Sequence, residues 1–264
     1  MKKPIRHLKH ASGLLLAAAM APSLSAQTPQ AASSANSSAI DAAAIAALDQ
    51  MGAKLRSLKQ FTLTSDTSID VVLDSGQKVE LDGQLTYKVS QPNRLFVELV
   101  SDRRLRQLIY DGRTLVVFAP RLGYYAEVDD VGSSIKELLA SASENYDVEL
   151  PLADLFAWGT ADSAKQSVLS AIAVGPALIK GEQTDQYAFR QQGVDWQIWI
   201  SRSSRLPLKL QIVSLDDPAL PQYEAALKWD TTTTLPDKTF TFVPPEGSGR
   251  IALKPADREV ASER

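Results

Sequence analysis

The sequence predicts a mostly β protein with added helices (α+β), in which an antiparallel sheet curls into an open barrel or a strongly bent sheet. Three observations carry this prediction. Residues 61–128 alternate apolar and polar side chains in segments joined by short turns, as consecutive antiparallel strands do. The alternation stops at 132–169, where helical spacing replaces it. It then returns, and the stretch Asp195–Val213 forms the clearest hairpin, with an apolar face and a polar face.

The first 26 residues have the pattern of a secretory signal peptide. A basic start precedes an apolar run at 14–21 and a small-residue exit at 23–26. An uncleaved membrane anchor is the alternative, but a spanning helix needs about 20 apolar residues and Pro22 ends this run early. We therefore expect cleavage after Ala26, a periplasmic location in a Gram-negative cell, and no integral membrane span.

Composition narrows the classes of partner. The chain has 264 residues, of which 44% are hydrophobic and 22% charged, as in an ordinary soluble protein. The signal contains four of the 28 basic residues and both histidines. The chain without it therefore has 24 basic and 31 acidic residues. This acidic balance argues against nucleic acid as a partner. The chain has no cysteine, so neither disulfides nor lipid attachment to a cysteine is available.

The elements follow in order. Residues 27–38 have the composition of a flexible leader. Apolar residues at helical spacing then predict a helix of about five turns whose apolar stripe packs in the core. Strands are expected at 61–73, 79–89, 94–100, 105–110, 113–119 and 122–128, and turns at 74–77, 92–93, 102–103, 111–112 and 120–121. The stripe of the helix consists of Ile40, Ala44, Leu48, Met51, Leu55 and Leu58.

The second half begins with the helical insertion. Ile135, Leu138 and Leu139 share one helical face after a cap at Ser133 or Ser134, and further short helical pieces are expected at 152–158 and 161–169. Strands resume at 171 and continue through the hairpin to 229. The stretch 240–243 is expected to form a last edge strand, which two prolines stop. We expect one domain at 39–253 and a polar tail at 254–264.

The mature chain lacks the usual residues of catalysis and metal binding. Without His or Cys, the common nucleophile-base pairs and zinc, copper and iron ligand sets are excluded. Residues 133–136 match S-x-x-K, but the K-T-G and S-D-N elements are missing, so a helix cap is preferred. The acid pairs 129–130 and 216–217 offer carboxylates for sugar hydrolysis, although caps and turns explain them better. We expect no enzyme, no metal and no cofactor.

Three short motifs carry a resemblance to a known family: Tyr110-Asp111-Gly112, Trp199-Ile200-Ser201 followed by Leu206-Pro207-Leu208-Lys209, and Phe240-Thr241-Phe242-Val243-Pro244-Pro245-Glu246-Gly247. In this order, across about 40–251, they resemble the periplasmic lipoprotein carrier superfamily of LolA and LolB. The chain looks closer still to an uncharacterised family of predicted periplasmic proteins beside them. The resemblance implies a half-open antiparallel β-barrel whose concave apolar face is covered by an inserted helical lid, here 135–169.

The resemblance also implies an apolar ligand site. Arg94, which follows Pro92, is the nearest analogue of the carriers' lid-closing strand arginine, and a surface ion pair is the alternative. The aromatic residues, Trp158, Trp196, Trp199 and Trp229 among them, either line a cavity or fill the core. Because Trp199 lies on the polar face of the hairpin, we expect it under the N-terminal helix or at an interface. The expected ligand-binding residues are Leu85, Tyr87, Leu95, Val97, Leu99, Leu138, Leu139, Trp196, Ile198 and Leu210.

The function expected from these features is that of a periplasmic binding or carrier protein. Its partner would be a hydrophobic small molecule, such as a lipid or an acyl chain, or an acylated protein such as a lipoprotein. The alternative is an envelope protein-protein interaction or sensor domain that uses the same barrel as a platform for another envelope protein.

Overall fold

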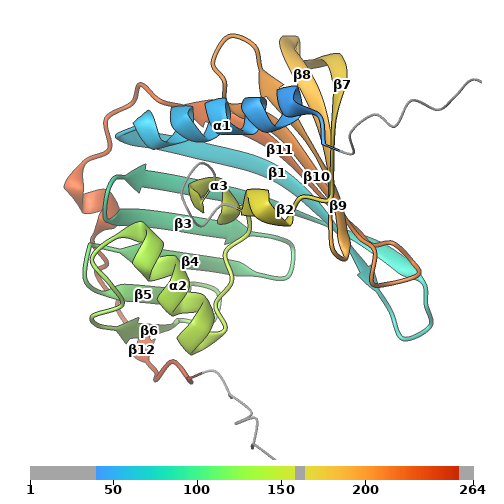
Figure 1. Cartoon of the computed structure of the whole chain (residues 1–264). Helices are drawn as coiled ribbons and strands as arrows, with labels where there is room; N and C mark the ends of the chain where they lie inside the picture. The colour runs from blue at the N-terminus through green and yellow to red at the C-terminus, as the bar shows by residue number, and fades with distance from the viewer. Residues whose placement is uncertain (1–39, 158–163, 256–264) are drawn as a thin grey trace, which may run out of the picture. The chain divides into compact units, whose positions relative to one another are not determined.

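A bent sheet of twelve strands is the framework of the protein (Figure 1). The computed structural model describes residues 40–157 and 164–255, which belong to one compact unit. The strands are β1 (Gln60–Val72), β2 (Lys78–Ser90), β3 (Arg94–Val100), β4 (Leu105–Tyr110), β5 (Leu115–Ala119), β6 (Tyr124–Val128), β7 (Ser170–Ile179), β8 (Glu182–Gln191), β9 (Val194–Ser201), β10 (Pro207–Ser214), β11 (Gln222–Asp230) and β12 (Gly249–Arg250).

The sheet is open. Its order is β12-β6-β5-β4-β3-β2-β1-β11-β10-β9-β8-β7, so β12 and β7 form the two ends. Neighbouring strands are antiparallel except β12, which runs parallel to β6. The six strands predicted between 61 and 128 are present as β1 to β6, with bounds that differ by at most two residues. The prediction of a mostly β protein with an open, bent antiparallel sheet is therefore confirmed.

Helices cover one face of the sheet, which we name the helix face. They are α1 (Ala42–Ser57), α2 (Ile135–Tyr146) and α3 (Asp154–Ala157), with the short 3₁₀ turn η1 (Ala164–Ser167). A second 3₁₀ turn, η2 (Asp237–Phe240), belongs to the C-terminal part of the chain. The side chain of Asp41 caps α1 by accepting a hydrogen bond from the amide of Ala43 (2.8 Å). Figure 1 shows α1 running across one half of the sheet and α2 lying over the strands of the other half. The main core lies between these helices and the helix face.

The other face, which we name the outer face, carries a second apolar layer next to β4, β5 and β6. Ile109, Val116 and Phe118 alternate away from the helix face, yet each is at most 7% exposed. The C-terminal strap, residues 231–250, crosses this layer. The ring of Phe242 lies 5.3 Å from that of Phe118 and 5.2 Å from that of Tyr125 (centroid distances).

The strap corrects one prediction. The prediction of an edge strand at 240–243 is wrong, because Phe240 ends η2 and the next eight residues form neither helix nor strand. The edge strand is β12, at Gly249–Arg250. Two aromatic side chains two residues apart imitate strand alternation, but here they cover the outer face. Figure 1 shows the strap leading down to β12 at the side of β6.

The helical insertion agrees with the sequence in part. The described residues contain α2 and α3 within 132–157, as expected. The third piece, expected at 161–169, is reduced to η1, while 161–163 and Trp158 lie outside the described residues. The signal peptide, the leader and residues 256–264 of the tail also lie outside them, so those assignments stay predictions.

Candidate apolar ligand site

The structure brings the ten residues expected to bind ligand into one core on the helix face. Strands β2, β3, β9 and β10 supply eight of them, and α2 supplies Leu138 and Leu139. Leu99, Leu139 and Leu210 are half-buried, whereas the other seven are at most 6% exposed. Trp196, for example, stacks on Phe189 with ring centroids 4.2 Å apart. These seven side chains fill the interior in this structure, and contact with a ligand stays a prediction for all ten.

Unfilled space on the helix face lies where the helices meet. A pocket of about 240 Å³ lies between the end of α1, the start of α2, α3, and the strands β1 and β11. We name it the helix-junction pocket. Its apolar lining consists of Leu55, Phe61, Leu63, Pro92, Ile135, Leu155, Phe156 and Trp229, and its polar lining of Arg56, Gln91, Ser134 and Lys136. None of the ten expected residues lines it.

Three aromatic rings form one wall of the pocket. The ring of Phe61 lies 6.3 Å from that of Phe156 and 5.4 Å from that of Trp229, measured between centroids. The indole N–H of Trp229 donates to the carbonyl oxygen of Pro207 (2.7 Å), so its polar group is already satisfied. Tyr87 packs behind Phe156, with centroids 5.6 Å apart. The wall therefore offers apolar surface to an occupant.

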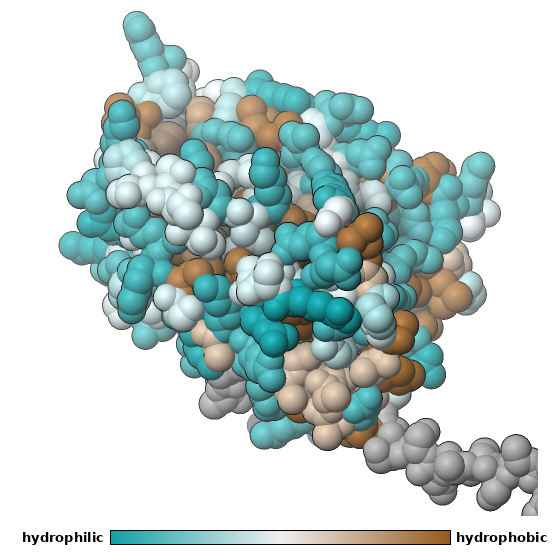
Figure 2. Space-filling model, turned by 90° about the horizontal axis from the view of Figure 1, so that it is seen from above, coloured by the Kyte–Doolittle hydropathy of each residue, from teal (hydrophilic) through white to brown (hydrophobic). Residues whose placement is uncertain are grey.

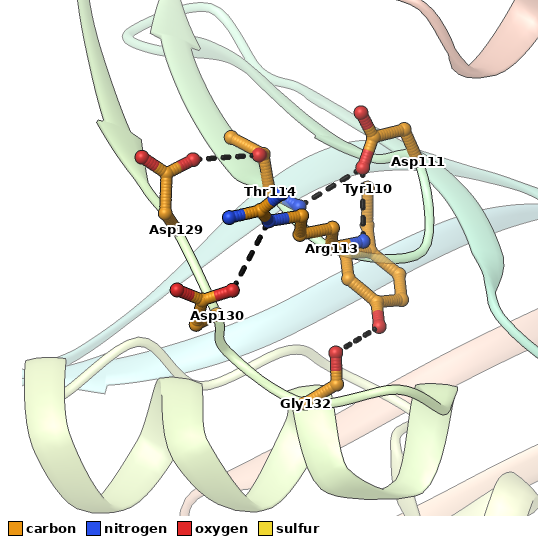
Figure 3. Close-up of polar contacts among 7 residues, drawn as sticks. All are labelled: Tyr110, Asp111, Arg113, Thr114, Asp129, Asp130 and Gly132. Carbon is orange, nitrogen blue, oxygen red and sulfur yellow. Dashed lines mark hydrogen bonds and ion pairs between the residues drawn. The ribbon is translucent and has the colours of Figure 1, made fainter.

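Two tyrosines of the sheet hold the segment that contains α2. The hydroxyl of Tyr110 donates to the carbonyl oxygen of Gly132 before the helix (2.8 Å; Figure 3). The hydroxyl of Tyr87 donates to the carbonyl oxygen of Pro151 after it (2.6 Å). Neither residue is exposed, and burial raises the pKa of both hydroxyls. Both hydroxyls therefore stay protonated donors, and both ends of the α2 segment are tied to the sheet.

The Tyr110-Asp111-Gly112 motif has a structural explanation. The carboxylate of Asp111 accepts from the amides of Arg113 and Thr114, both at 2.9 Å, and so fixes the turn between β4 and β5. Figure 3 shows the next contacts. The Thr114 hydroxyl donates to Asp129 (2.7 Å), and the Arg113 side chain pairs with Asp130 (3.1 Å). The motif thus fixes the loop that leads into α2.

The two acid pairs lie in different parts of the sheet. The pair 129–130 follows β6, and the pair 216–217 lies between β10 and β11. Six strands separate β6 from β10 in the sheet order. Asp217 serves its own turn by accepting from the amide of Ala219 (2.8 Å). Within the described ranges 40–157 and 164–255, no three His, Cys, Asp or Glu side chains form a group that could hold a metal ion.

The S-x-x-K match is a helix cap, as preferred. The Ser134 hydroxyl accepts from the amide of Glu137 (3.2 Å), and the carboxylate of Glu137 accepts from the amide (2.7 Å) and hydroxyl (3.0 Å) of Ser133. These two bonds from Ser133 hold the pKa of Glu137 below its usual range. The cap therefore stabilises α2 fully above the ordinary glutamate pKa, and its contribution is lost as pH falls through the lowered value.

We expect Glu137→Gln to remove this acid sensitivity. The amide keeps a hydrogen-bond acceptor but has no charge to titrate, so the loss of stability between about pH 7 and about pH 3 should be smaller than in the native chain. Urea unfolding at both pH values measures the difference. Equal acid-induced losses in the native chain and the variant would contradict the assignment of the cap.

Arg94 and Trp199 both belong to the outer face. Arg94, at the start of β3, pairs with Asp237 of η2, so the surface ion pair is confirmed. Trp199 is 9% exposed, and the ammonium of Lys209 lies 5.1 Å from its ring centroid. Lys209 in turn pairs with Glu224 (2.8 Å). The expectation that the N-terminal helix covers Trp199 was wrong, because α1 lies on the helix face; the alternative, an interface with a partner, stays a prediction.

Figure 2 shows that the face above α1 is mostly hydrophilic, with separate small hydrophobic patches. That face therefore offers no broad apolar surface. In the described part of the chain, no helix has both the length and the hydropathy needed to cross a bilayer. The helix-junction pocket provides accessible apolar surface on the helix face.

Comparison with known proteins gives one family. A family model described as "Predicted periplasmic protein (DUF2092)" matches residues 44–254. A search of curated protein sequences finds no match.

Similar solved structures have low sequence identity. They include the MucA/MucB complex of Pseudomonas aeruginosa, at 15% identity over 76% of this chain and 62% of that chain (TM-score 0.43). LprF of Mycobacterium bovis matches at 11% identity over 75% and 97% of the two chains (TM-score 0.42). A LolA superfamily protein of Nitrosomonas europaea matches at 12% over 75% and 97% (TM-score 0.34). This chain spans less than two thirds of the MucA/MucB-complex chain that it matches.

Proposed function

The chain belongs to the DUF2092 family of predicted periplasmic proteins, and we propose that it is a periplasmic binding or carrier protein for a hydrophobic ligand. Membership confirms the family and the periplasmic location expected from the sequence. In the proposal, the ligand is a lipid, an acyl chain or the acyl group of a lipoprotein. It lies in the helix-junction pocket between the sheet and the helices.

The apolar lining of the pocket carries this proposal. Eight of the twelve lining residues that the structure describes are apolar, and three of these contribute the aromatic wall. Ligand sites have this composition, with few polar groups among apolar and aromatic ones. A volume of about 240 Å³ lies just below the range of roughly 300–1,000 Å³ that drug-sized ligands occupy. The pocket therefore suits one acyl chain rather than a bulky lipid.

A larger ligand would need α2 to move. We assign the lid function to the segment 135–169, whose α2 part lies over the half of the sheet that contains β3, the strand of Leu95 and Val97. Lifting α2 breaks the hydrogen bonds of Tyr87 and Tyr110. In this proposal the ten expected residues contact the ligand only in the open state. A single-domain organisation at 39–253, with the signal removed after Ala26, completes the proposal.

The test measures binding and its location. Protein purified from the periplasm is examined by native mass spectrometry and lipid extraction, then titrated with a fluorescent fatty-acid probe. Phe156→Asp places a charge in the pocket, at a half-buried position. We expect this variant to bind the probe at least about tenfold more weakly. Val243→Asp, at a residue that is 75% exposed in the strap, is the control and should bind normally.

Equal probe affinity in the native chain and Phe156→Asp would place the ligand elsewhere. The absence of both a co-purifying ligand and probe binding would contradict the proposal as a whole.

A second candidate function uses the end strand β7. Ile172, Val174 and Leu178 of this strand are 54%, 52% and 61% exposed, an unusual density of apolar side chains at a sheet edge. Among the described residues, Ile40 bridges Ala171 at the start of this edge. An envelope protein could add a strand to the remainder. A stoichiometric complex that survives Val174→Lys would count against this site.

A further inference from the structure

We propose that one corner of the sheet docks the protein on a lipid bilayer that contains anionic phospholipids. We name this surface the arginine corner, and it consists of Arg103, Arg104, Arg106 and Arg121. The inference goes beyond the proposed function. A surface that meets a bilayer is distinct from a pocket that holds a ligand, so each of the two can fail without the other.

Two neighbouring turns form the arginine corner. β3 runs antiparallel to β4, and β4 runs antiparallel to β5, so the β3–β4 and β5–β6 turns lie at the same end of the sheet (Figure 1). The amide of Ser101 closes the first turn by donating to the carbonyl oxygen of Arg104 (2.8 Å). The guanidinium of Arg121 donates to the carbonyl oxygen of Asp102 (2.8 Å). This bond joins the second turn to the first and brings their cations together.

The arginine corner concentrates positive charge. All four arginines are exposed, and three of them lie in the short stretch 103–106. Within the described ranges 40–157 and 164–255, none of the four forms an ion pair with a carboxylate. Elsewhere on the sheet exposed arginines are paired, as Arg190 is with Asp195 (2.6 Å). The corner therefore stands out in a chain whose exported form is acidic.

The described acids around the corner leave most of this charge in place. Asp102 lies in the first turn, and Asp82 lies on β2 just beyond the end of β3, so together they offset two of the four charges. Asp74 belongs to the β1–β2 turn, but β2 pairs with β3 only from Gln84 onward. That turn therefore lies roughly 20 Å further along the hairpin, at about 3.3 Å per residue. This separation exceeds the Debye length of about 8 Å at physiological salt.

An apolar tip completes the docking surface. Leu122, next to Arg121 in the second turn, is 70% exposed, and Tyr124 at the start of β6 is 51% exposed. The amides of Leu122 and Gly123 both donate to the carbonyl oxygen of Ala119 (3.0 Å each), which fixes the tip. An exposed leucine beside cations can enter the boundary between headgroups and acyl chains, and tyrosine favours the same depth. An acidic protein would match the charge alone, so charge and tip together favour a bilayer.

The experiment is co-sedimentation of the mature protein with lipid vesicles. One set contains equal amounts of phosphatidylglycerol and phosphatidylcholine, and the other contains phosphatidylcholine alone. We expect binding to the anionic vesicles only, and added salt should weaken it. The triple variant Arg103→Gln/Arg104→Gln/Arg121→Gln should bind them at least about tenfold more weakly, since each cation near an anionic surface contributes about fivefold. Leu122→Ser keeps the charge and should weaken binding at least about threefold.

The matched control is Lys59→Gln/Lys228→Gln/Lys238→Gln, which removes the same charge from exposed lysines toward the opposite end of the sheet. It should bind the anionic vesicles like the native chain. Equal behaviour of the native chain on both kinds of vesicle, or equal losses in the two triple variants, would overturn the inference. Both triple variants should still bind the fatty-acid probe, so the result for docking is read separately from the result for the carrier proposal.

Discussion

Replacing Phe240 with alanine is expected to lower the free energy of unfolding by about 3–5 kcal/mol, the usual cost of removing a fully buried phenylalanine. Phe240 is only 2% exposed, although it lies in the strap and outside the main core. The strap is further held by the ion pair of Arg94 with Asp237 and by the packing of Phe242 on Phe118. Urea unfolding of the native chain and the variant measures the change.

Val243→Ala provides the control from the same strap. Val243 is 75% exposed, so its truncation should change stability by no more than about 0.5 kcal/mol. Similar losses for Phe240→Ala and Val243→Ala would show that the strap adds little to the folded structure, which would contradict the assignment of an outer apolar layer.

The second large effect concerns Tyr87, whose hydroxyl ties the α2 segment to the sheet. Tyr87→Phe keeps the ring but leaves the carbonyl oxygen of Pro151 without this donor. Loss of one partner from a buried hydrogen bond costs about 1–3 kcal/mol. We expect the variant to be less stable by that amount in urea unfolding. We also expect faster association with a fatty-acid probe in stopped-flow measurements, because the lid is released more easily.

Tyr223 offers the matched control, and the expected sign is opposite. Its hydroxyl is buried and finds no hydrogen-bond partner among the described residues, and burial raises its pKa to about 12. Tyr223→Phe removes an unsatisfied polar atom, so stability should stay the same or rise by about 1 kcal/mol. If both variants lose the same stability, the bond to Pro151 has no special role.

The sequence predicted most of the sheet, because half-buried strands leave a period-two pattern that short turns interrupt. β2 is the clearest case: Leu85, Tyr87 and Val89 face the core, and the polar residues between them face outward. The N-terminal helix was predicted for the same reason, since the apolar stripe of α1 matches its buried face. Such local periodicity reflects one covered face and one wet face.

The strap could not be predicted in this way. Phe240 and Phe242 have strand-like spacing, and nothing local shows that their partners are side chains of the outer face of β5 and β6. That face is itself unusual, because Val116 and Phe118 are both buried although Val117 between them also faces the core. A run of apolar residues on both faces of β5 was the available signal for a second covering layer.

The sequence predicted the face of the sheet on which the helix-junction pocket lies, but not the residues that line the pocket. All ten expected residues lie on the helix face or the helix that covers it, yet a small protein fills most of that space with side chains. Where the space remains depends on where the ends of α1 and α2 meet, which periodicity does not fix. Phe61 and Trp229 come together because β1 and β11, far apart in the sequence, are adjacent antiparallel strands, and no local pattern shows this pairing.

Quenching of tryptophan fluorescence by 12-bromododecanoate tests the central claim most directly, because bromine quenches an indole that it touches. Trp229 lines the helix-junction pocket, whereas Trp196 and Trp199 do not. In a Trp158→Phe background, we predict that the compound quenches the fluorescence and that Trp229→Phe abolishes most of the effect. Equal quenching with and without Trp229, or none in either protein, would contradict ligand binding in this pocket.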